Sequence, residues 1–314
     1  MQTRFRSVRG LGALNYPQRV SLVEVGPRDG LQNEPSVVAT RTKAQFIDRL
    51  SETGLAHIEG SSFVKPQSVP QLADAEAVFT QIRRKQGITY SALVPNTEGL
   101  DRALSVGVSE ISVFAAASDT FSRKNINCDI RGSLRRFEPV LKRADTERLK
   151  VRAYLSCVLG CPYEGRVDPK TVARLARCLL DMGCYEVALA DTIGIGTPLQ
   201  ARELVTETAT RIPVEHIALH FHDTRGQALA NILACLEEGV SVFDTSVAGL
   251  GGCPYAPGAS GNVATEDVVY MLNGMGIETG IDLESLIEVG NFISRTLSRA
   301  NQSKVGCAGV PATR

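Results

Sequence analysis

An alternation of short β-branched runs with amphipathic segments extends along most of this chain and limits its fold more than any other feature. Eight runs are expected to form strands, at 20–25, 56–60, 88–94, 110–116, 149–158, 185–191, 216–222 and 240–247. Helical patterns stand between them, at 40–53, 97–106, 170–182, 198–211 and 226–238. Gly residues follow several of these helices, as expected where a helix ends in the left-handed conformation. Eight strand–helix repeats predict an α/β protein with a (β/α)₈ (TIM) barrel.

The alternative α/β architecture, a doubly wound sheet, fits less well. Such sheets carry a Gly-rich fingerprint after the first strand, whereas here the sequence "GPRDGLQNE" follows it. The length of 314 residues suits one barrel with additions. We expect an N-terminal tail at 1–17 and a single catalytic domain at 18–314. Two helical stretches filling 282–303 are expected to cap the barrel or to form a subunit contact, which favours a homodimer.

The charge balance excludes two classes of partner. Lys and Arg together number 34, as do Asp and Glu, so neither a nucleic-acid footprint nor a basic membrane arm is indicated. No apolar run approaches the roughly 18–20 residues of a membrane span. The eight cysteines form no CxxC motif and indicate a reducing compartment. The Arg-containing N-terminus without acids before Glu24 fits a short tail of a bacterial cytoplasmic protein, with a mitochondrial presequence as the alternative.

Active sites of these barrels lie at the C-terminal ends of the strands, so polar residues there are candidates for chemistry. They are Arg28 and Asp29 after strand one, Glu59, Ser61 and Ser62 at strand two, Tyr154, Ser156 and Cys157 at strand five, Asp191 and Thr192 at strand six, His220, His222 and Asp223 at strand seven, and Cys253 and Asn262 after strand eight.

Two of the four histidines of this chain, His220 and His222, stand two residues apart at the end of strand seven. Residues two apart in a strand face the same side, so both imidazoles project together and Phe221 points toward the helix layer. With Asp29 from across the barrel and an amide oxygen from Asn262, they form a candidate six-coordinate site. This donor set suits Mg²⁺ or Mn²⁺ better than Zn²⁺ or Co²⁺. The alternative is a pair of hydrogen-bonded core histidines.

Other polar residues have a structural interpretation. His57 and His216 are expected at the opposite, N-terminal ends of their strands, away from any chemistry. Asp191 and Asp223 are candidates for orienting ligands rather than binding the ion.

Cys253 lies in the Gly-rich loop 248–262. Glycines permit unusual dihedral angles and movement, so a thiol on such a loop over the barrel mouth is a candidate acid or base. The alternative is a loop cysteine without a role.

Several motifs closely resemble those of the 3-hydroxy-3-methylglutaryl-CoA lyases, a family of metal-dependent barrel lyases. The similarity runs from about residue 18 to about residue 300, and the "GLGGCPYA" segment is its most specific part. The motifs are "VEVGPRDGLQNE" (23–34), "NINCDI" (125–130), "CVLGCPYEG" (157–165), "ADTIGIGTP" (190–198), "HFHDTRGQALAN" (220–231) and "SVAGLGGCPYAPGASGNVATEDVVYML" (246–272).

The resemblance implies an oxo-acid lyase that splits (S)-3-hydroxy-3-methylglutaryl-CoA into acetyl-CoA and acetoacetate, in leucine breakdown or ketone-body supply. A Mg²⁺ or Mn²⁺ ion would hold the tertiary hydroxyl and the free carboxylate of this acyl-CoA. The implied metal ligands are Asp29, His220, His222 and Asn262.

The resemblance also implies roles for the other candidates. Arg28 would stabilise the enolate, Cys253 would protonate it, and Glu59 would support catalysis. The base is either His220 or Asp29. The implied substrate-pocket positions are Arg28, Ser62, Tyr154, Asp191 and Thr192.

The chain departs from the family pattern at 65–68, where "KPQS" replaces Ser-Pro-Lys-Trp, at Phe221, which replaces a cysteine, and at Arg225, which replaces a tyrosine. These changes leave open a lyase for a longer 3-hydroxy-3-alkylglutaryl-CoA. Two further alternatives are a Claisen condensation synthase of the same superfamily and a non-catalytic barrel that binds a metal or an acyl-CoA.

Overall fold

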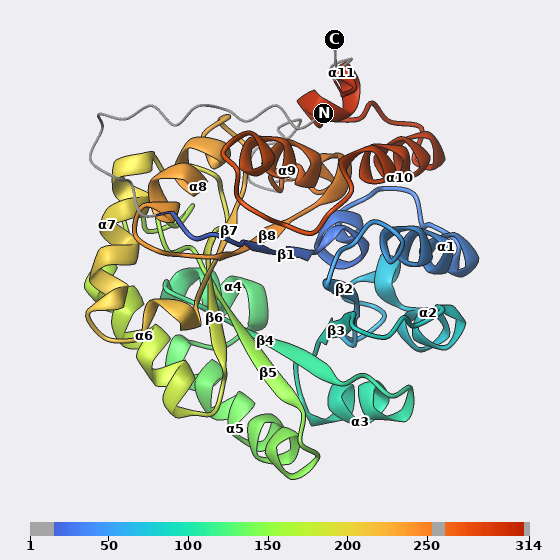
Figure 1. Ribbon diagram of the computed structural model, residues 1–314. Helices are drawn as coiled ribbons and strands as arrows, with labels where there is room; N and C mark the ends of the chain where they lie inside the picture. The colour runs from blue at the N-terminus through green and yellow to red at the C-terminus, as the bar shows by residue number, and fades with distance from the viewer. Residues whose placement is uncertain (1–15, 253–260, 311–314) are drawn as a thin grey trace, which may run out of the picture.

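Eight parallel strands close into a barrel in the order of the chain, so the (β/α)₈ prediction is confirmed (Figure 1). The computed structural model describes residues 16–252 and 261–310. The strands are β1 (Ser21–Glu24), β2 (His57–Ser62), β3 (Thr89–Leu93), β4 (Glu110–Ala116), β5 (Lys150–Ser156), β6 (Glu186–Asp191), β7 (Ile217–Phe221) and β8 (Val242–Thr245). β1 pairs with both β2 and β8, so the barrel closes between the first and last strands.

Helices surround the barrel and follow the predicted segments within a few residues. They are α1 (Thr40–Leu50), α2 (Ala75–Gln81), α3 (Thr97–Ser105), α4 (Asp119–Ile126), α5 (Ile130–Thr146), α6 (Pro169–Asp181), α7 (Pro198–Ala209), α8 (Ala228–Leu236), α9 (Thr265–Gly274), α10 (Leu283–Thr296) and α11 (Lys304–Ala308). The expected list lacked α2, α4 and α5. The first two are short, and α5 contains Pro139, a residue that usually marks a helix end.

The prediction of two helical stretches filling 282–303 is confirmed for the first, α10, whereas residues 297–303 are not helical. α10 ends at Thr296, and Ser298 adopts a left-handed φ of 52°. Helix resumes only at Lys304, where the Ser303 hydroxyl accepts a hydrogen bond from the backbone N–H of Gly306 at 2.8 Å. The left-handed residue therefore breaks the helical stretch, and a side-chain cap starts the next one.

The main apolar core lies between the strands and the helices. Phe221 is 1 % exposed and belongs to this core, so it faces the helix layer as its position next to two histidines predicts. Burying one such side chain stabilises the fold by roughly 1.5–3 kcal/mol. Inside the barrel a smaller apolar cluster lies beside buried charges. Its members are Leu93, Tyr154, Ala188 and Ala218.

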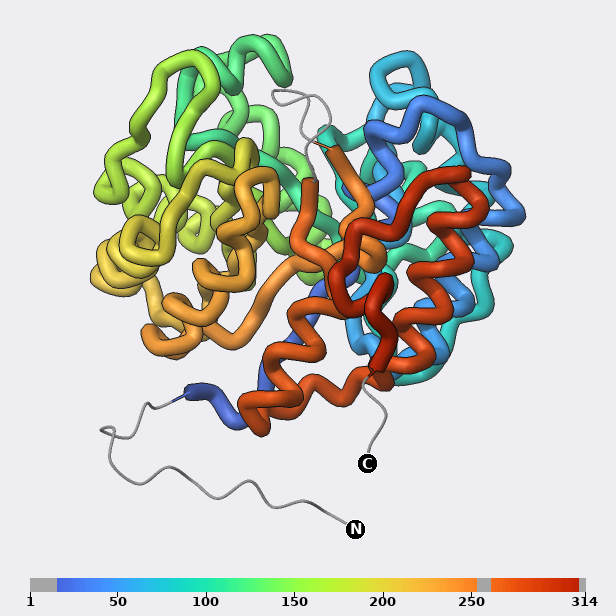
Figure 2. The backbone as a smooth tube through the Cα atoms, turned by 90° about the horizontal axis from the view of Figure 1, so that it is seen from above, coloured from blue at the N-terminus to red at the C-terminus, as the bar shows by residue number. Residues whose placement is uncertain are grey.

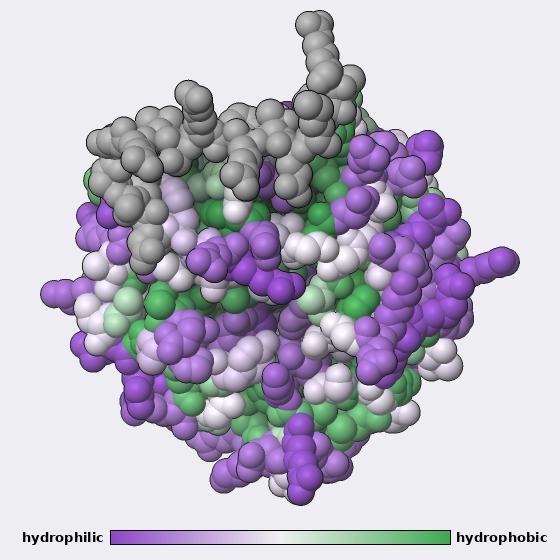
Figure 3. Space-filling model, viewed as in Figure 1, coloured by the Kyte–Doolittle hydropathy of each residue, from purple (hydrophilic) through white to green (hydrophobic). Residues whose placement is uncertain are grey.

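The C-terminal helices pack against the outer helix layer near the first helix, α1. α10 contacts α1, and the two lie side by side in both views (Figures 1 and 2). The face drawn in Figure 3 is largely hydrophilic, with apolar residues dispersed among charged ones. No helix in the described part of the chain is long and apolar enough to cross a membrane.

Candidate active site

A tight turn after β1 carries Arg28 and Asp29 over the end of the barrel. The turn is a π-helix, η1 (Gly26–Gly30), rather than an extension of the strand. Its amide groups converge on one carbonyl oxygen: the N–H groups of Arg28, Asp29 and Gly30 lie 3.1, 2.8 and 3.1 Å from Val25 O. π-Helical turns are rare in proteins, and those that occur are often found at functional sites.

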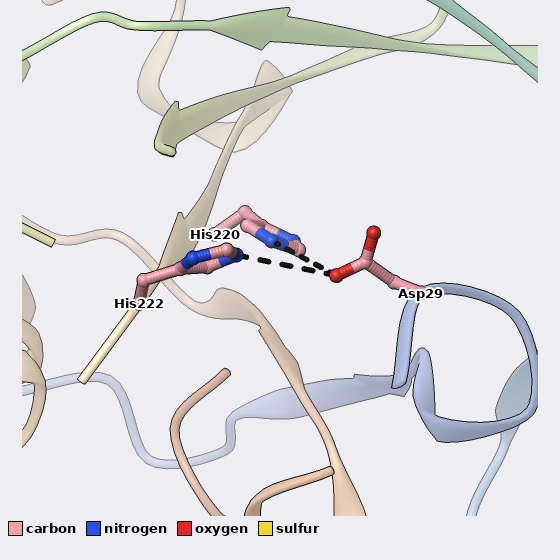
Figure 4. A group of neighbouring side chains, drawn as sticks. All are labelled: Asp29, His220 and His222. Atoms are coloured by element: carbon pink, nitrogen blue, oxygen red, sulfur yellow. Dashed lines mark ion pairs between the residues drawn. The ribbon is translucent and has the colours of Figure 1, made fainter. Parts of the chain in front are cut away.

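The side chains of Asp29, His220 and His222 converge at this end of the barrel (Figure 4). Each offers one ligand atom, and these atoms all lie within 4.8 Å of one another. Asp29 Oδ2 is 3.9 Å from His220 Nε2 and 4.0 Å from His222 Nε2. The expectation that Asp29 comes from across the barrel is wrong. β8 alone separates β1 from β7, so the carboxylate approaches from the side.

Asn262 adds an amide to this cluster. Its Nδ2 donates to Asp29 Oδ2 at 2.8 Å and to Leu250 O at 3.1 Å, and its backbone forms a bridge with His222. Its Oδ1 and the Nδ1 of His222 are buried without a hydrogen-bond partner in the described structure. Buried polar atoms are rarely left unpaired. Two imidazoles, a carboxylate and an unsatisfied amide oxygen therefore fit a divalent cation.

Electrostatics keep these groups in the forms that bind metals. Burial raises the pKa of Asp29, but Arg28, His220, His222 and the amide of Asn262 together bring it well below its ordinary range. Burial and, after it, the neighbouring His220 lower the pKa of His222 to about 4, against the opposing charge of Asp29. A carboxylate and a neutral imidazole are thus present at neutral pH, as metal binding requires.

Arg28 is held between two carboxylates beside this cluster. Its Nε donates to Glu59 Oε2 at 2.5 Å and its Nη1 to Asp29 Oδ1 at 2.6 Å. Glu59 also accepts hydrogen bonds from Ser112 Oγ at 2.5 Å and from the Tyr154 hydroxyl at 3.2 Å. The guanidinium carbon of Arg28 lies 5.0 Å from the Tyr154 ring centre, a cation–π contact. The guanidinium of Arg28 is therefore fixed in one orientation.

Two residues that contact this cluster, one of them through the other, were not among the candidates from sequence. Asp244 on β8 lies 3.0 Å from His220 Nδ1, and both of its carboxylate oxygens accept hydrogen bonds from Arg152 on β5. Burial raises the pKa of Asp244, but Arg152 and His220 bring it down to about 2. The available signal was a charge inside each of two apolar runs, "VRAYLS" and "VSVFDTSV".

The remaining candidates divide between the mouth of the barrel and its turns. Ser62 Oγ is buried without a partner among the described residues. Asp191 accepts hydrogen bonds from the backbone N–H groups of Ile195 and Gly196, and Thr192 Oγ1 accepts one from the N–H of Cys157. The side chains of Asp191 and Thr192 thus form hydrogen bonds within turns. They do not reach the group of Asp29, His220 and His222, which is called the ion cluster below. Their substrate contacts stay predictions.

His57 and His216 contact other groups, away from the ion cluster. His57 Nε2 lies 3.1 Å from Glu110, and His216 Nδ1 lies 2.7 Å from the carbonyl oxygen of Tyr185. Asp223 accepts the N–H of Ala228 at 2.9 Å, near the start of α8. Cys253 lies outside the described residues.

Comparisons with known proteins give a consistent result. A family model described as HMGL-like matches residues 19–293. A 3-hydroxy-3-isohexenylglutaryl-CoA/hydroxy-methylglutaryl-CoA lyase of Pseudomonas aeruginosa is 55% identical, over 94% of this chain and 98% of the relative. The mitochondrial hydroxymethylglutaryl-CoA lyase of Gallus gallus is also 55% identical, over 93% and 98% of the two chains. A solved HMG-CoA lyase of Acinetobacter baumannii, in complex with coenzyme A and 3-methylmalate, matches with a TM-score of 0.90 and 38% identity, over 94% and 96% of the chains.

Proposed function

The chain belongs to the HMGL-like family, and from this premise we propose that it is a carbon–carbon lyase that splits (S)-3-hydroxy-3-methylglutaryl-CoA into acetyl-CoA and acetoacetate. The observation that carries the proposal is the convergence of Asp29, His220 and His222 next to the Arg28–Glu59 pair. A binding protein has no need for both an ion cluster and a fixed, buried cation beside it.

The reaction makes three chemical demands. A base removes the proton of the tertiary hydroxyl, and the bond between C2 and C3 of the acyl chain breaks as the hydroxyl carbon becomes the ketone of acetoacetate. The electron pair of that bond remains on the thioester fragment as an enolate. An acid then protonates the enolate carbon to give acetyl-CoA. These roles are those of general acid–base and electrostatic catalysis.

Asp29, His220, His222 and Asn262 are the proposed ligands of a Mg²⁺ or Mn²⁺ ion. When bound, the ion supplies positive charge that lowers the pKa of the substrate hydroxyl and stabilises negative charge on its oxygen. The buried, unpaired Oδ1 of Asn262 supports its place among the ligands. Asp29 and His220 are the two candidates for accepting the hydroxyl proton. Asp29 is favoured, because a carboxylate keeps lone pairs besides the one that binds the ion, whereas His220 Nε2 has a single lone pair.

Arg28 is proposed to stabilise the enolate. Glu59 and Asp29 hold its Nε and Nη1, and its Nη2 makes no hydrogen bond with the described residues. This remaining nitrogen can donate to the thioester oxygen, and charge-assisted donors that are fixed in advance stabilise developing negative charge strongly. The Ser62 hydroxyl, which has no hydrogen-bond partner among the described residues, is proposed to contact substrate together with Tyr154.

Cys253 is proposed as the acid that protonates the enolate. The support comes from its "GLGGCPYA" motif and from the neighbouring described residues. Gly251, two positions before it, lies so close to Asn262 that an added Cβ would meet the amide nitrogen at 2.8 Å. The chain therefore enters the segment containing Cys253 directly beside a proposed ligand.

A second substrate is favoured by one observation. The Pseudomonas aeruginosa relative carries the name of a lyase for both the methyl and the isohexenyl acyl group, at 55% identity. We propose that this chain also cleaves longer 3-hydroxy-3-alkylglutaryl-CoA esters, with the methyl compound as the principal substrate.

The test is the release of acetoacetate and acetyl-CoA from 3-hydroxy-3-methylglutaryl-CoA, with Mn²⁺ and after removal of metals by EDTA. We expect turnover that needs the ion and falls by roughly 10²–10⁴-fold in Cys253→Ala, the range for loss of a general acid. Cys178→Ala, a thiol on the outer helix α6, is the matched control and should retain activity. A folded, ion-loaded protein that releases neither product refutes the assignment, and consumption of acetyl-CoA instead would indicate a synthase.

Assembly and location are also proposed. The C-terminal helices are the support for a proposed homodimer, and the Pseudomonas aeruginosa relative is the support for a proposed place in the bacterial cytoplasm. The mitochondrial matrix is the alternative that the Gallus gallus relative represents. Light scattering after size-exclusion chromatography measures the assembly, and a monomer at micromolar concentration contradicts the dimer.

A further inference from the structure

A buried chain of charges lies behind one of the two histidines. Asp244 is fully buried, and its Oδ2 lies 3.0 Å from His220 Nδ1. Arg152 donates from Nη1 to Oδ2 at 3.1 Å and from Nη2 to Oδ1 at 2.7 Å. Glu186 in turn accepts a hydrogen bond from Arg152 Nε at 2.5 Å. Each member is thus held in place by the next.

This arrangement determines where the proton of neutral His220 resides. An ionised carboxylate only accepts hydrogen bonds, so Asp244 requires a proton on Nδ1 of the imidazole. Nε2 is then left with a free lone pair, and this is the atom that faces Asp29 Oδ2 at 3.9 Å. The group bonded to one nitrogen of a metal-binding histidine commonly selects the tautomer in this way.

His222 provides an internal contrast. Its Nδ1 is buried without a partner in the described structure, so none of the described residues selects its tautomer. The two imidazoles are tilted at 45° with their centres 5.3 Å apart, and only His220 has a carboxylate behind it. An effect on tautomer should therefore appear at His220 alone.

We propose that Asp244 and Arg152 are positioning residues that set the affinity of the site for its ion, by fixing the Nδ1–H tautomer of His220. Arg152 orients both oxygens of Asp244, and Asp244 orients the imidazole. The inference rests on the proposed function in one respect, the identification of His220 as a ligand.

The proposal makes an unusual prediction for two substitutions. In Asp244→Asn the Arg152 fork retains the amide oxygen, and the NH₂ group turns toward His220 Nδ1. A donor facing Nδ1 drives the proton to Nε2, the ligand atom. Asp244→Ala removes the acceptor without imposing the wrong tautomer. The asparagine variant, although closer in shape to the natural residue, should therefore bind Mn²⁺ more weakly than the alanine variant.

The experiment measures Mn²⁺ binding to the metal-free full chain by calorimetry, and the tautomer of His220 by ¹⁵N NMR of the imidazoles. Four histidines make the spectrum assignable by single substitutions. We expect a loss of affinity of about 10–100-fold in Asp244→Ala, a larger loss in Asp244→Asn, and a proton on Nε2 of His220 in the asparagine variant.

Glu110→Gln is the matched control. Glu110 is also a buried acid beside an imidazole, with its Oε1 3.1 Å from His57 Nε2, but outside the ion cluster. It should leave Mn²⁺ affinity unchanged, whereas a general loss of fold would lower affinity in all three variants together.

The outcomes separate the two proposals, because neither readout uses the substrate. Unchanged affinity and an unchanged His220 tautomer in Asp244→Asn overturn the inference, even if the lyase activity is established. The expected ranking in a protein that does not cleave 3-hydroxy-3-methylglutaryl-CoA supports the inference and overturns the proposed function. Absence of Mn²⁺ binding by the unsubstituted chain overturns both.

Discussion

Glu266 offers a stability prediction that can be worked from its surroundings. It lies on α9 with no exposed surface, and both carboxyl oxygens are about 3 Å from the backbone N–H of Ala248 (3.0 and 2.9 Å). Ala248 has a left-handed φ of 59° in the turn η4 (Val247–Gly249) that begins the loop after β8. Burial raises the pKa of Glu266 to about 8, a buried carboxyl at Glu24 adds to this, and backbone hydrogen bonds oppose it.

The sign of the effect follows from linkage. Because the folded pKa of about 8 lies above the unfolded value of 4.5, stability from this group is fully present below pH 4.5 and is lost as pH rises through 8. At ~1.4 kcal/mol for each pKa unit, the loss reaches about 3 kcal/mol at pH 7 and about 5 kcal/mol well above pH 8. Glu266→Gln keeps the shape of the protonated acid and removes the ionisation. The free energy of unfolding of the variant, relative to that of the natural chain, should therefore rise by about 3 kcal/mol from pH 5 to pH 8.

The assay is urea unfolding of the metal-free protein at pH 5 and pH 8, for the natural chain, Glu266→Gln and the exposed control Glu98→Gln. The free energy of unfolding of Glu98→Gln should change between pH 5 and pH 8 by the same amount as that of the natural chain. If the free energy of unfolding of Glu266→Gln also changes by that same amount, the folded protein ionises this carboxyl at its ordinary pKa. The argument from burial is then refuted.

Three further results are expected. Because the pKa of His222 is lowered from 6.5 to about 4, stability of the metal-free protein should fall by ~3 kcal/mol from pH 6.5 to pH 4, and His222→Gln should flatten this slope in denaturant titrations. Glu59→Gln should lower kcat roughly 100-fold with little change in KM, because Arg28 loses its charged acceptor; steady-state kinetics with an equal KM and kcat effect would contradict this. Gly54→Ala should destabilise far more than the ~1 kcal/mol expected of Gly87→Ala, since both have positive φ but only the former meets a backbone oxygen, at 2.1 Å; equal midpoints in thermal melts would contradict it.

The barrel was predictable because strand and helix periodicities alternate eight times, and because strand ends meet at one face. The same rule identifies Asp29, His220 and His222 as candidates for one site from the order of residues alone. The rule could not predict the direction from which the Asp29 side chain approaches the two histidines. The direction of Asp29 depends on the π-helical turn Gly26–Gly30, which has no periodic signal in five residues.

Partners inside the barrel were not predictable for a different reason. Alternation along a strand tells which side a residue faces, but not which residue of another strand it meets. Arg152 and Asp244 are 92 residues apart and come together only because β5 and β8 face one interior. The short α2 escaped the prediction because a brief helix offers few turns of periodicity, and α5 escaped it because its interior Pro139 is a residue that usually marks a helix end.

The placement of the ion cluster has a consequence for how the chain acquires its site during synthesis. Asp29 and Asn262 are separated by 233 residues, and the barrel closes between β8 and β1, where they meet. A nascent chain that has not yet released β8 from the ribosome offers no complete cluster. Binding of the proposed ion would therefore stabilise only the finished barrel, by about 2.7 kcal/mol at a hundredfold excess over Kd. The proposed ion would then link residues from the two ends of the chain.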